Sequence, residues 1–216
     1  MNREMEQKNF QMEWVMMNLR LSGSGISGES AQRIAEGGYD LTATLEEHQL
    51  VAGLIDVLQL MDLLLGLREE LSAPTLDRFY QKVSGGESPS YRRRTPVLFH
   101  LSYNPVLPTE IPDELKKLFR LLHGEDRADA AERAVYVHNE IIRIWPFEQY
   151  SDIIARAALE YELLYGGFPP CPLTLSETEY NSALAGYLRT GRETVIAENL
   201  RMNLLMRQEQ YTRREK

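Results

Sequence analysis

The sequence has very little cysteine: Cys171 is the only one among 216 residues. A lone cysteine excludes an intrachain disulfide, which argues against a disulfide-held secreted scaffold and fits a reducing compartment. We therefore expect a cytoplasmic protein. Because Cys171 follows two prolines and has no obvious base near it in the sequence, we interpret it as a packing residue.

Runs of β-branched residues are also scarce, whereas Leu, Ala and Glu are plentiful. This composition favours helices over strands, because unbranched side chains lose little freedom in a helix. With 43% hydrophobic and 26% charged residues, the chain can bury the core of one domain with a small appendage. The expected fold class is all-α, a bundle of about seven to eight helices with a small β-hairpin.

A long uninterrupted apolar run is missing as well. The longest stretch, residues 50–67, is interrupted by Asp56 and Asp62, which a membrane span would tolerate poorly. The apolar patch at residues 14–17 is too short for the core of a signal peptide. We therefore expect no membrane association and a long helix buried inside the bundle.

The chain also lacks a net positive charge, since 24 basic residues face 32 acidic ones and the formal charge is -8. An acidic surface repels phosphate backbones, so we expect no nucleic-acid partner. The basic run Arg92-Arg93-Arg94 is typical of a solvated or salt-bridged loop.

Helical spacing accounts for most of the chain. Phe10, Trp14, Met17 and Leu21 predict a first helix, which the Ser/Gly-rich turn at residues 22–28 ends. Further helices are expected at residues 44–70, 72–83, 112–122, 128–144, 152–165, 177–188 and 193–208.

Local signals fix some of these boundaries. Thr44 and Glu47 have capping-box spacing, and Ser151 can cap the helix that follows it. Between residues 88 and 112 the prolines exclude a long helix, so Val97 to Leu101 with a turn at Tyr103 predicts the hairpin.

One segment resembles a known motif. Residues 145–156 read W-P-F-E-Q-Y-S-D-I-I-A-R and align without a gap to H-P-F-x-[D/E]-G-N-G-R-x-x-R, the signature of the Fic (Fido) family. Pro146, Phe147 and Arg156 match that signature.

The flanks of the motif resemble the family as well. They include the helix that leads into the motif, a Gly-Phe-Pro-Pro exit at residues 167–170 and a Ser-Tyr-Arg element at residues 90–92. The similarity therefore covers roughly residues 45–204 of the chain.

The resemblance implies a helical protein that transfers AMP from ATP to a protein hydroxyl. In the family the motif histidine is the general base, and Trp145 stands at that position. An indole has no basic nitrogen, so Trp145 cannot accept the proton. Gln149 stands at the acidic Mg²⁺-binding position, and a neutral amide is a weaker ligand for this hard cation. Glu148, one residue earlier, could replace it only if the loop shifted.

The family's phosphate-binding G-N-G run is here Tyr150-Ser151-Asp152. Side chains and a negative charge therefore stand where backbone N–H groups would wrap phosphates. Ile153 stands at the position of the first arginine of the motif, so Arg156 is the one cation of the motif that remains. Ser151, Asp152 and Arg156 are the candidate ligand- or phosphate-binding residues, and an ion pair with a nearby acid such as Asp152 is the alternative role for Arg156.

Two residues on the helix before the motif have simpler interpretations. Trp145 ends an apolar stripe and is typical of a core residue, although it could instead shape a ligand pocket. His138 lies on the same stripe and is either a hydrogen-bonded core histidine or a relocated base.

Many Fic proteins carry an inhibitory helix with the pattern [S/T]-x-x-x-E-[G/N], whose glutamate pairs with the second motif arginine, here Arg156. Ile26-Ser27-Gly28 resembles the end of that pattern, with Ser27 in place of the glutamate. A plain Ser/Gly turn explains the same residues.

These observations favour a degenerate Fic protein without AMP transfer, acting as a binding module for a protein partner. It would have no cofactor unless some activity, with ATP and Mg²⁺, is retained. The alternatives are a divergent Fic transferase that moves a nucleotide or phosphate-containing group, and a helical regulatory or scaffold subunit unrelated to Fic. A homo-oligomer is a further expectation.

The expected organisation has three parts. Residues 1–43 form an N-terminal helix and a Ser/Gly turn that resembles the Fic inhibitory segment. Residues 44–205 form the Fic-like helical domain, and residues 206–216 form a polar C-terminal tail.

Overall fold

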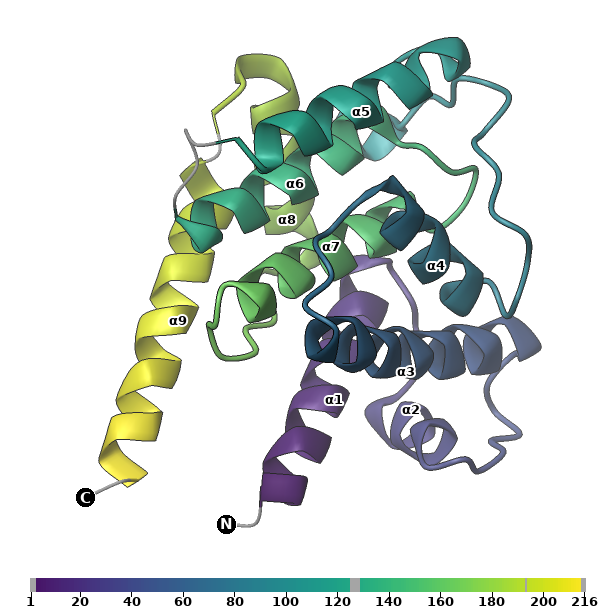
Figure 1. Ribbon diagram of the computed structural model, residues 1–216. Helices are drawn as coiled ribbons and strands as arrows, with labels where there is room; N and C mark the ends of the chain where they lie inside the picture. Colours follow the sequence, from purple (N-terminus) through teal and green to yellow (C-terminus); the bar gives the residue numbers. More distant parts are fainter. Residues whose placement is uncertain (1–2, 125–128, 193, 215–216) are drawn as a thin grey trace.

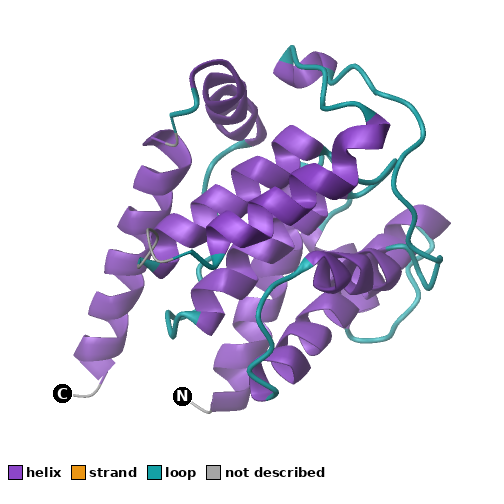
Figure 2. Ribbon diagram, turned by 45° about the horizontal axis from the view of Figure 1, so that its top comes forward, coloured by secondary structure: helices purple, strands orange, loops and turns teal. Residues whose placement is uncertain are grey.

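The computed structural model describes residues 3–124, 129–192 and 194–214. Within these residues the chain forms nine α-helices, two short 3-10 helices and no strand (Figures 1 and 2). In chain order the elements are α1 (Arg3–Leu21), α2 (Gly28–Ala35), α3 (Leu45–Gly66), α4 (Ala73–Val83), η1 (Phe99–Leu101), η2 (Pro108–Glu110), α5 (Ile111–Leu122), α6 (Ala130–Ile144), α7 (Ser151–Tyr165), α8 (Glu177–Thr190) and α9 (Thr194–Arg214).

The all-α prediction is confirmed, but the hairpin is not formed. Leu98 and Tyr103 make one isolated antiparallel bridge, and η1 fills the turn between them. Pro96 and Pro105 flank this bridge and have no N–H to donate, so the pairing does not extend into strands.

Helix α2 was not among the helices expected from the sequence, and it begins where the expected Ser/Gly turn ends. Ser27 is its N-cap, and its Oγ accepts a hydrogen bond from the Ser30 N–H at 3.1 Å. The helix has only eight residues and buries Ala31 and Ile34. So short an element shows too few periods for its apolar spacing to be recognised.

Helix α3 begins at the predicted capping box, in which Thr44 and Glu47 bond reciprocally. By length and composition α3 could cross a membrane, and here it packs against α1, α2, α4 and α7. Gly53 allows the contact with α4, because a Cβ at that position would lie 2.8 Å from the Val83 Cα.

Helices α6 and α7 lie side by side and form the most extensive helix pair (Figure 1). Most residues of both helices are buried, and α3, α4, α5, α8 and α9 surround them. The loop between the two helices carries the motif, so a buried helix precedes the candidate site and another follows it.

The C-terminal helix α9 continues to Arg214, so the boundary expected at residues 205 and 206 falls inside a helix. Ala128 and Glu193, at which two helices were expected to begin, lie outside the described residues. The same holds for the outermost residues of the expected N-terminal segment and C-terminal tail.

Candidate functional site

Trp145 ends helix α6 in a left-handed conformation. Its φ is 50° and its ψ is 65°, and its N–H donates to the Ile141 carbonyl at 2.7 Å. A residue with a Cβ pays about 1–2 kcal/mol in this region. The Trp145 side chain is half-buried and packs against the core, which stabilises the turn.

The motif loop is anchored by Phe147, which is fully buried and stacks on Tyr80 with 4.7 Å between ring centroids. Ser151 closes the loop: its Oγ accepts from the Phe147 N–H at 2.9 Å and donates to the Phe147 carbonyl at 3.0 Å. Ser151 is therefore not the N-cap that we expected. Tyr150 takes that position with φ 64°, and its side chain makes no cap bond.

Glu148 and Gln149 lie in the exposed part of the same loop. The negative charge of Glu148 favours the charged form of Arg92 and so opposes the lowering of the Arg92 pKa by burial. In the part of the chain that the structure describes, no group of three or more His, Cys, Asp and Glu side chains could hold a metal ion.

Arg156 of α7 is enclosed, with 1% of its surface exposed. Its Nε donates to Asn18 Oδ1 at 2.8 Å, and its Nη2 donates to Ser22 Oγ at 2.7 Å and to Asp152 Oδ2 at 2.9 Å. Its Nη1 donates to the Tyr180 hydroxyl at 3.5 Å, and the guanidinium lies 5.6 Å from the centre of the Tyr180 ring. All nitrogens of the guanidinium are thus engaged by the chain itself.

Arg156 and Asp152 stabilise each other's charged forms. Burial would lower the pKa of Arg156, but the Asp152 charge and the hydrogen bonds with Tyr180 and Asp152 raise it overall. Burial would raise the pKa of Asp152, but the charge and hydrogen bonds of Arg156, with a hydrogen bond from Ser22, lower it. The two residues therefore form an ion pair.

Asn18 and Ser22 are the residues of the N-terminal segment that contact Arg156, whereas Ser27 caps α2. Residues 18–23 align with the inhibitory pattern given above: Gly23 matches its final position, while Asn18 stands in place of Ser/Thr and Ser22 in place of Glu. Gly23 has φ 71°, which glycine adopts without strain. The expected match of the inhibitory pattern, at Ile26-Ser27-Gly28, was therefore placed too far toward the C-terminus.

Asn18 is held in place by its own helix. It is fully buried, and its Nδ2 donates to the Trp14 carbonyl at 3.0 Å. That bond leaves Asn18 Oδ1 directed to Arg156 as an acceptor. The contact between α1 and α7 is therefore preorganised.

His138 is fully buried beside this cluster. Its Nε2 lies 2.7 Å from the Tyr180 hydroxyl, and its Nδ1 lies 2.8 Å from Asn139 Oδ1. Burial, with the nearby Arg156 charge, lowers the pKa of His138 to about 4 despite the Asn139 hydrogen bond. A neutral ring that donates from Nδ1 and accepts at Nε2 satisfies both contacts, so His138 is a hydrogen-bonded core histidine.

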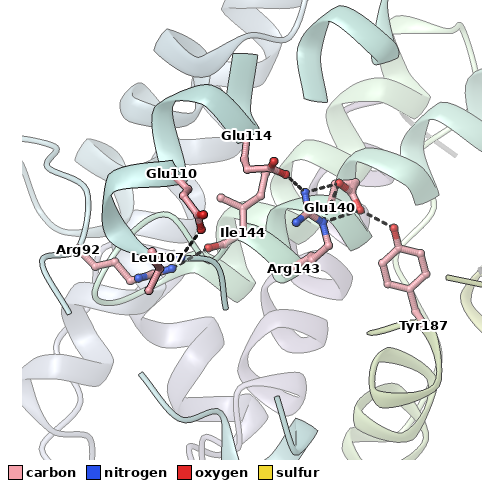
Figure 3. A network of polar contacts seen from close by, with 8 residues as sticks. All are labelled: Arg92, Leu107, Glu110, Glu114, Glu140, Arg143, Ile144 and Tyr187. Atoms are coloured by element: carbon pink, nitrogen blue, oxygen red, sulfur yellow. Dashed lines mark hydrogen bonds and ion pairs between the residues drawn. The ribbon is translucent and has the colours of Figure 1, made fainter. Parts of the chain in front are cut away.

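Arg92 joins the connection between α4 and α5 to the motif loop. It is 3% exposed, and its backbone N–H donates to the Pro146 carbonyl at 2.9 Å. Figure 3 shows its side chain at the end of α6. Its guanidinium donates to the backbone carbonyls of Ile144 (3.1 Å), Trp145 (2.7 Å), Arg94 (3.0 Å) and Val106.

A cation is favourable at this place, because the last carbonyls of a helix carry partial negative charge. Burial lowers the pKa of Arg92, and the Glu148 charge opposes that effect. The run of arginines is therefore not a uniformly solvated loop: Arg92 is inside, while Arg93 and Arg94 are exposed.

A second network on the same helix contains Arg143 (Figure 3). Its Nε donates to both carboxylate oxygens of Glu140, at 3.0 and 2.9 Å, and its Nη2 pairs with Glu114 of α5. The Tyr187 hydroxyl of α8 donates to Glu140 at 2.6 Å. These contacts fix α5 and α8 against α6, next to the turn that bears the motif.

The structure brings together only part of the predicted site. Asp152 and Arg156 meet, whereas Ser151 is used inside the loop and Glu148 is exposed. Asn18, Ser22 and Tyr180 were missed. For Tyr180 no sequence signal was available, whereas Asn18 and Ser22 belong to a pattern that could have been found in its correct register.

Comparisons with known proteins agree with this architecture. Residues 61–163 match the model of the Fic/DOC family. Protein adenylyltransferase fic-1 of Caenorhabditis elegans is 26% identical over 179 residues, which is 79% of this chain and 35% of that protein. Its Caenorhabditis briggsae counterpart is 25% identical with the same coverage. The chain thus spans about a third of the length of these curated relatives.

Solved structures share the fold. A fragment of Fic-1 from C. elegans superposes with a TM-score of 0.74 at 23% identity, covering 94% of this chain and 64% of that one. A Fic family protein from Desulfovibrio desulfuricans gives 0.76 at 15% identity, covering 97% and 66%. The hypothesis of a helical subunit unrelated to Fic is therefore wrong. Residues 61–163 thus match the Fic/DOC family, and the described chain has the fold of the solved Fic structures.

Proposed function

We propose that this chain is a cytoplasmic Fic-domain protein that lacks AMP-transfer activity and acts as a binding module for a protein partner. The enclosure of Arg156 carries the proposal. Arg156 is the cation that the motif retains for phosphate, yet each of its guanidinium nitrogens bonds to a group of the chain. An incoming phosphate would have to displace Asn18, Ser22 and Asp152.

The second support is the chemistry at the position of the general base. Trp145 offers an indole N–H, which donates a hydrogen bond and cannot take a proton from a hydroxyl. His138 does not replace it, since both ring nitrogens are occupied inside the core.

The residues of the loop do not fit ATP and Mg²⁺ in the manner of the family. Gln149 supplies a neutral amide where a carboxylate would bind the cation. Tyr150 brings a phenol ring, 6.2 Å from the Tyr80 ring, to a position where glycine would let the backbone approach phosphate. Asp152 adds a negative charge at the same place.

The proposal is tested with labelled ATP, Mg²⁺ and a cell extract as the source of acceptor proteins. We expect no labelled protein above the level of a heat-inactivated sample. The C. elegans Fic-1 adenylyltransferase serves as the positive control in the same extract. Mg²⁺-dependent AMP transfer by this chain would overturn the proposal.

A divergent transferase is the second candidate, because Glu148 and Gln149 are exposed beside the motif and accessible to a ligand. Thermal shift with ATP, ADP, GTP and CDP-choline, each with and without Mg²⁺, distinguishes the two candidates. A ligand that binds only the folded state raises the melting temperature by mass action. A shift that Arg156→Ala abolishes in a folded variant would favour the transferase.

A further inference from the structure

A groove runs along one face of α8, as far as the turn that leads into α9. The two helices meet at one edge of the molecule (Figure 1). Tyr180, Leu184 and Tyr187 of α8 are buried toward the core, so the groove lies on a different face of the helix. It has a volume of about 450 Å³, and its uncharged lining consists of Thr178, Ser182, Ala183, Gly186, Thr190 and Val195.

Gly186 lies near the middle of the groove, and packing inside the chain does not explain it. A Cβ at this position would meet no heavy atom of the described residues within 4 Å. Glycine is less favourable than alanine in the interior of a helix, so its presence here calls for another reason. A missing side chain lets the backbone of a second helix approach closely.

The two ends of the groove carry opposite charges. Glu179 lies in the first turn of α8, Arg189 lies in its last turn, and Arg192 lies just beyond it. All three residues are exposed. Hydrogen bonds from the side chain and the backbone of Ser176 lower the pKa of Glu179, so its carboxylate is charged at neutral pH. The groove is therefore acidic at one end and basic at the other.

These charges are placed almost symmetrically about Gly186. Glu179 precedes Gly186 by seven residues, and Arg192 follows it by six. Suppose that the α8 helix of a second copy lies antiparallel in the groove and crosses it at Gly186. The Glu179 carboxylate of each copy would then face the Arg192 guanidinium of the other. The groove is thus complementary to itself, as a two-fold symmetric interface requires.

We propose that α8 is a self-association surface, through which two copies of this chain pair antiparallel about a two-fold axis. The inference goes beyond the proposed function and does not depend on it, since none of the lining residues belongs to the motif. The charges favour a second copy over a nucleic acid or an anionic membrane. A polyanion would be attracted by the arginines but repelled by Glu179, whereas a second copy is complementary at both ends.

The test is sedimentation velocity of the full chain between about 1 and 500 µM, a range that covers weak and transient interfaces. We expect the mean mass to rise with concentration from that of the 24.9 kDa monomer toward twice this value. An interface of one helix from each copy is small, so the dimer should be weak. Its dissociation constant should increase with salt, because exposed charges are screened.

Gly186→Leu tests the close approach of the two helices. In the monomer the new side chain has open space and leucine favours the helix, so the fold should be as stable as before or more stable. In the dimer the same side chain would fill the contact and raise the dissociation constant at least about tenfold. The control is Gly66→Leu near the end of α3, where a Cβ also has open space. It should associate within about twofold of the unchanged chain.

A charge swap tests the pairing at the ends of the groove. E179K and R192E should each raise the dissociation constant at least about tenfold, whereas the double variant should return to within about threefold of the unchanged chain. E179K also loses the hydrogen bonds with Ser176, but the single and double variants share this loss. R93E, at an exposed arginine far away in the sequence, is the control and should change little.

The inference is overturned if the chain stays monomeric at every concentration, in which case the groove would serve a different partner. It is also overturned if Gly186→Leu or R192E associates as tightly as its control, or if the charge swap does not restore association. Sedimentation and AMP transfer are separate readouts. An active transferase that dimerises through α8 would contradict the proposed function alone, and an inactive monomer would contradict this inference alone.

Discussion

The Ser22 hydroxyl lies 2.7 Å from Nη2 of Arg156, although 134 residues separate the two in the chain. The same hydroxyl donates to the Asp152 carboxylate at 3.0 Å. The end of α1 therefore completes the environment of the ion pair on α7. A neutral residue serves here where the family's inhibitory pattern has a glutamate, and Asp152 supplies the negative charge.

This arrangement predicts that α1 contributes to stability through Arg156. Asn18→Ala removes the acceptor of the buried Nε and should lower the free energy of unfolding by about 2 kcal/mol, as expected for a hydrogen bond to a charged group. Ser22→Ala should cost less, about 1 kcal/mol, because Asp152 also accepts from Nη2. Urea unfolding followed by circular dichroism measures both. If Asn18→Ala matches the exposed control Ser88→Ala, the contact contributes nothing to stability.

The backbone of Trp145 gives a second prediction. With φ at 50°, glycine should be tolerated better than alanine once the indole is removed. Trp145→Gly is expected to be about 1 kcal/mol more stable than Trp145→Ala, although both lose the packing of the side chain. Thermal and urea unfolding of the two variants measure the difference. An alanine variant of equal or greater stability would show that the turn relaxes when the indole is absent.

Two glycines of α3 form a matched pair for a third prediction. Gly53→Ala places a Cβ 2.8 Å from the Lys82 carbonyl and should destabilise the protein by about 1–3 kcal/mol through overpacking. Gly66→Ala has open space and should be neutral or stabilising by up to about 1 kcal/mol, because alanine favours the helix. Urea midpoints of the two variants provide the comparison. Equal midpoints would mean that α3 and α4 separate easily.

Glu160 of α7 gives a prediction of pH dependence. It is 1% exposed and accepts the Cys171 N–H at 2.9 Å. Burial raises the pKa of Glu160 to about 7, against the opposing effects of that hydrogen bond and of the Arg207 charge. Between the ordinary pKa of 4.5 and about pH 7, Glu160 therefore keeps a proton in the folded state that it has lost in the unfolded chain. The contribution of Glu160 to stability is present below its ordinary pKa and is lost as the pH rises toward 7.

Glu160→Gln keeps an acceptor for the Cys171 N–H and cannot ionise. Its stability relative to the unchanged chain should therefore increase by about 3 kcal/mol between pH 5 and 8, which is the free energy of a shift of this size. Urea unfolding across this range measures the increase, with the exposed Glu198→Gln as control. A constant difference across the range would mean that water reaches the carboxyl group.

Local patterns explain what could be predicted from the sequence. The capping box at Thr44 and the apolar stripe that ends at Trp145 depend on residues a few positions apart, so the boundaries of α3 and α6 follow from them. Asp152 and Arg156 lie one helical turn apart, and their ion pair could be anticipated for the same reason.

Contacts between distant segments could not be predicted in this way. Asn18 lies 138 residues before Arg156, and only the resemblance of residues 18–23 to the inhibitory pattern links the two in the sequence. The role of Arg92 is similar, because its acceptors are backbone carbonyls, which every sequence has. Ser151 shows a further limit: a serine before a helix is typical of a cap, but the buried Phe147 backbone competes for its hydroxyl.

Arg92 binds the Ile144 carbonyl at the end of α6, 52 residues away in the chain, and also the Val106 carbonyl in the connection before α5. Neither segment can move far from the other while this one guanidinium is in place. The two should therefore open as a single cooperative unit, with their backbone amides exchanging hydrogen for deuterium together.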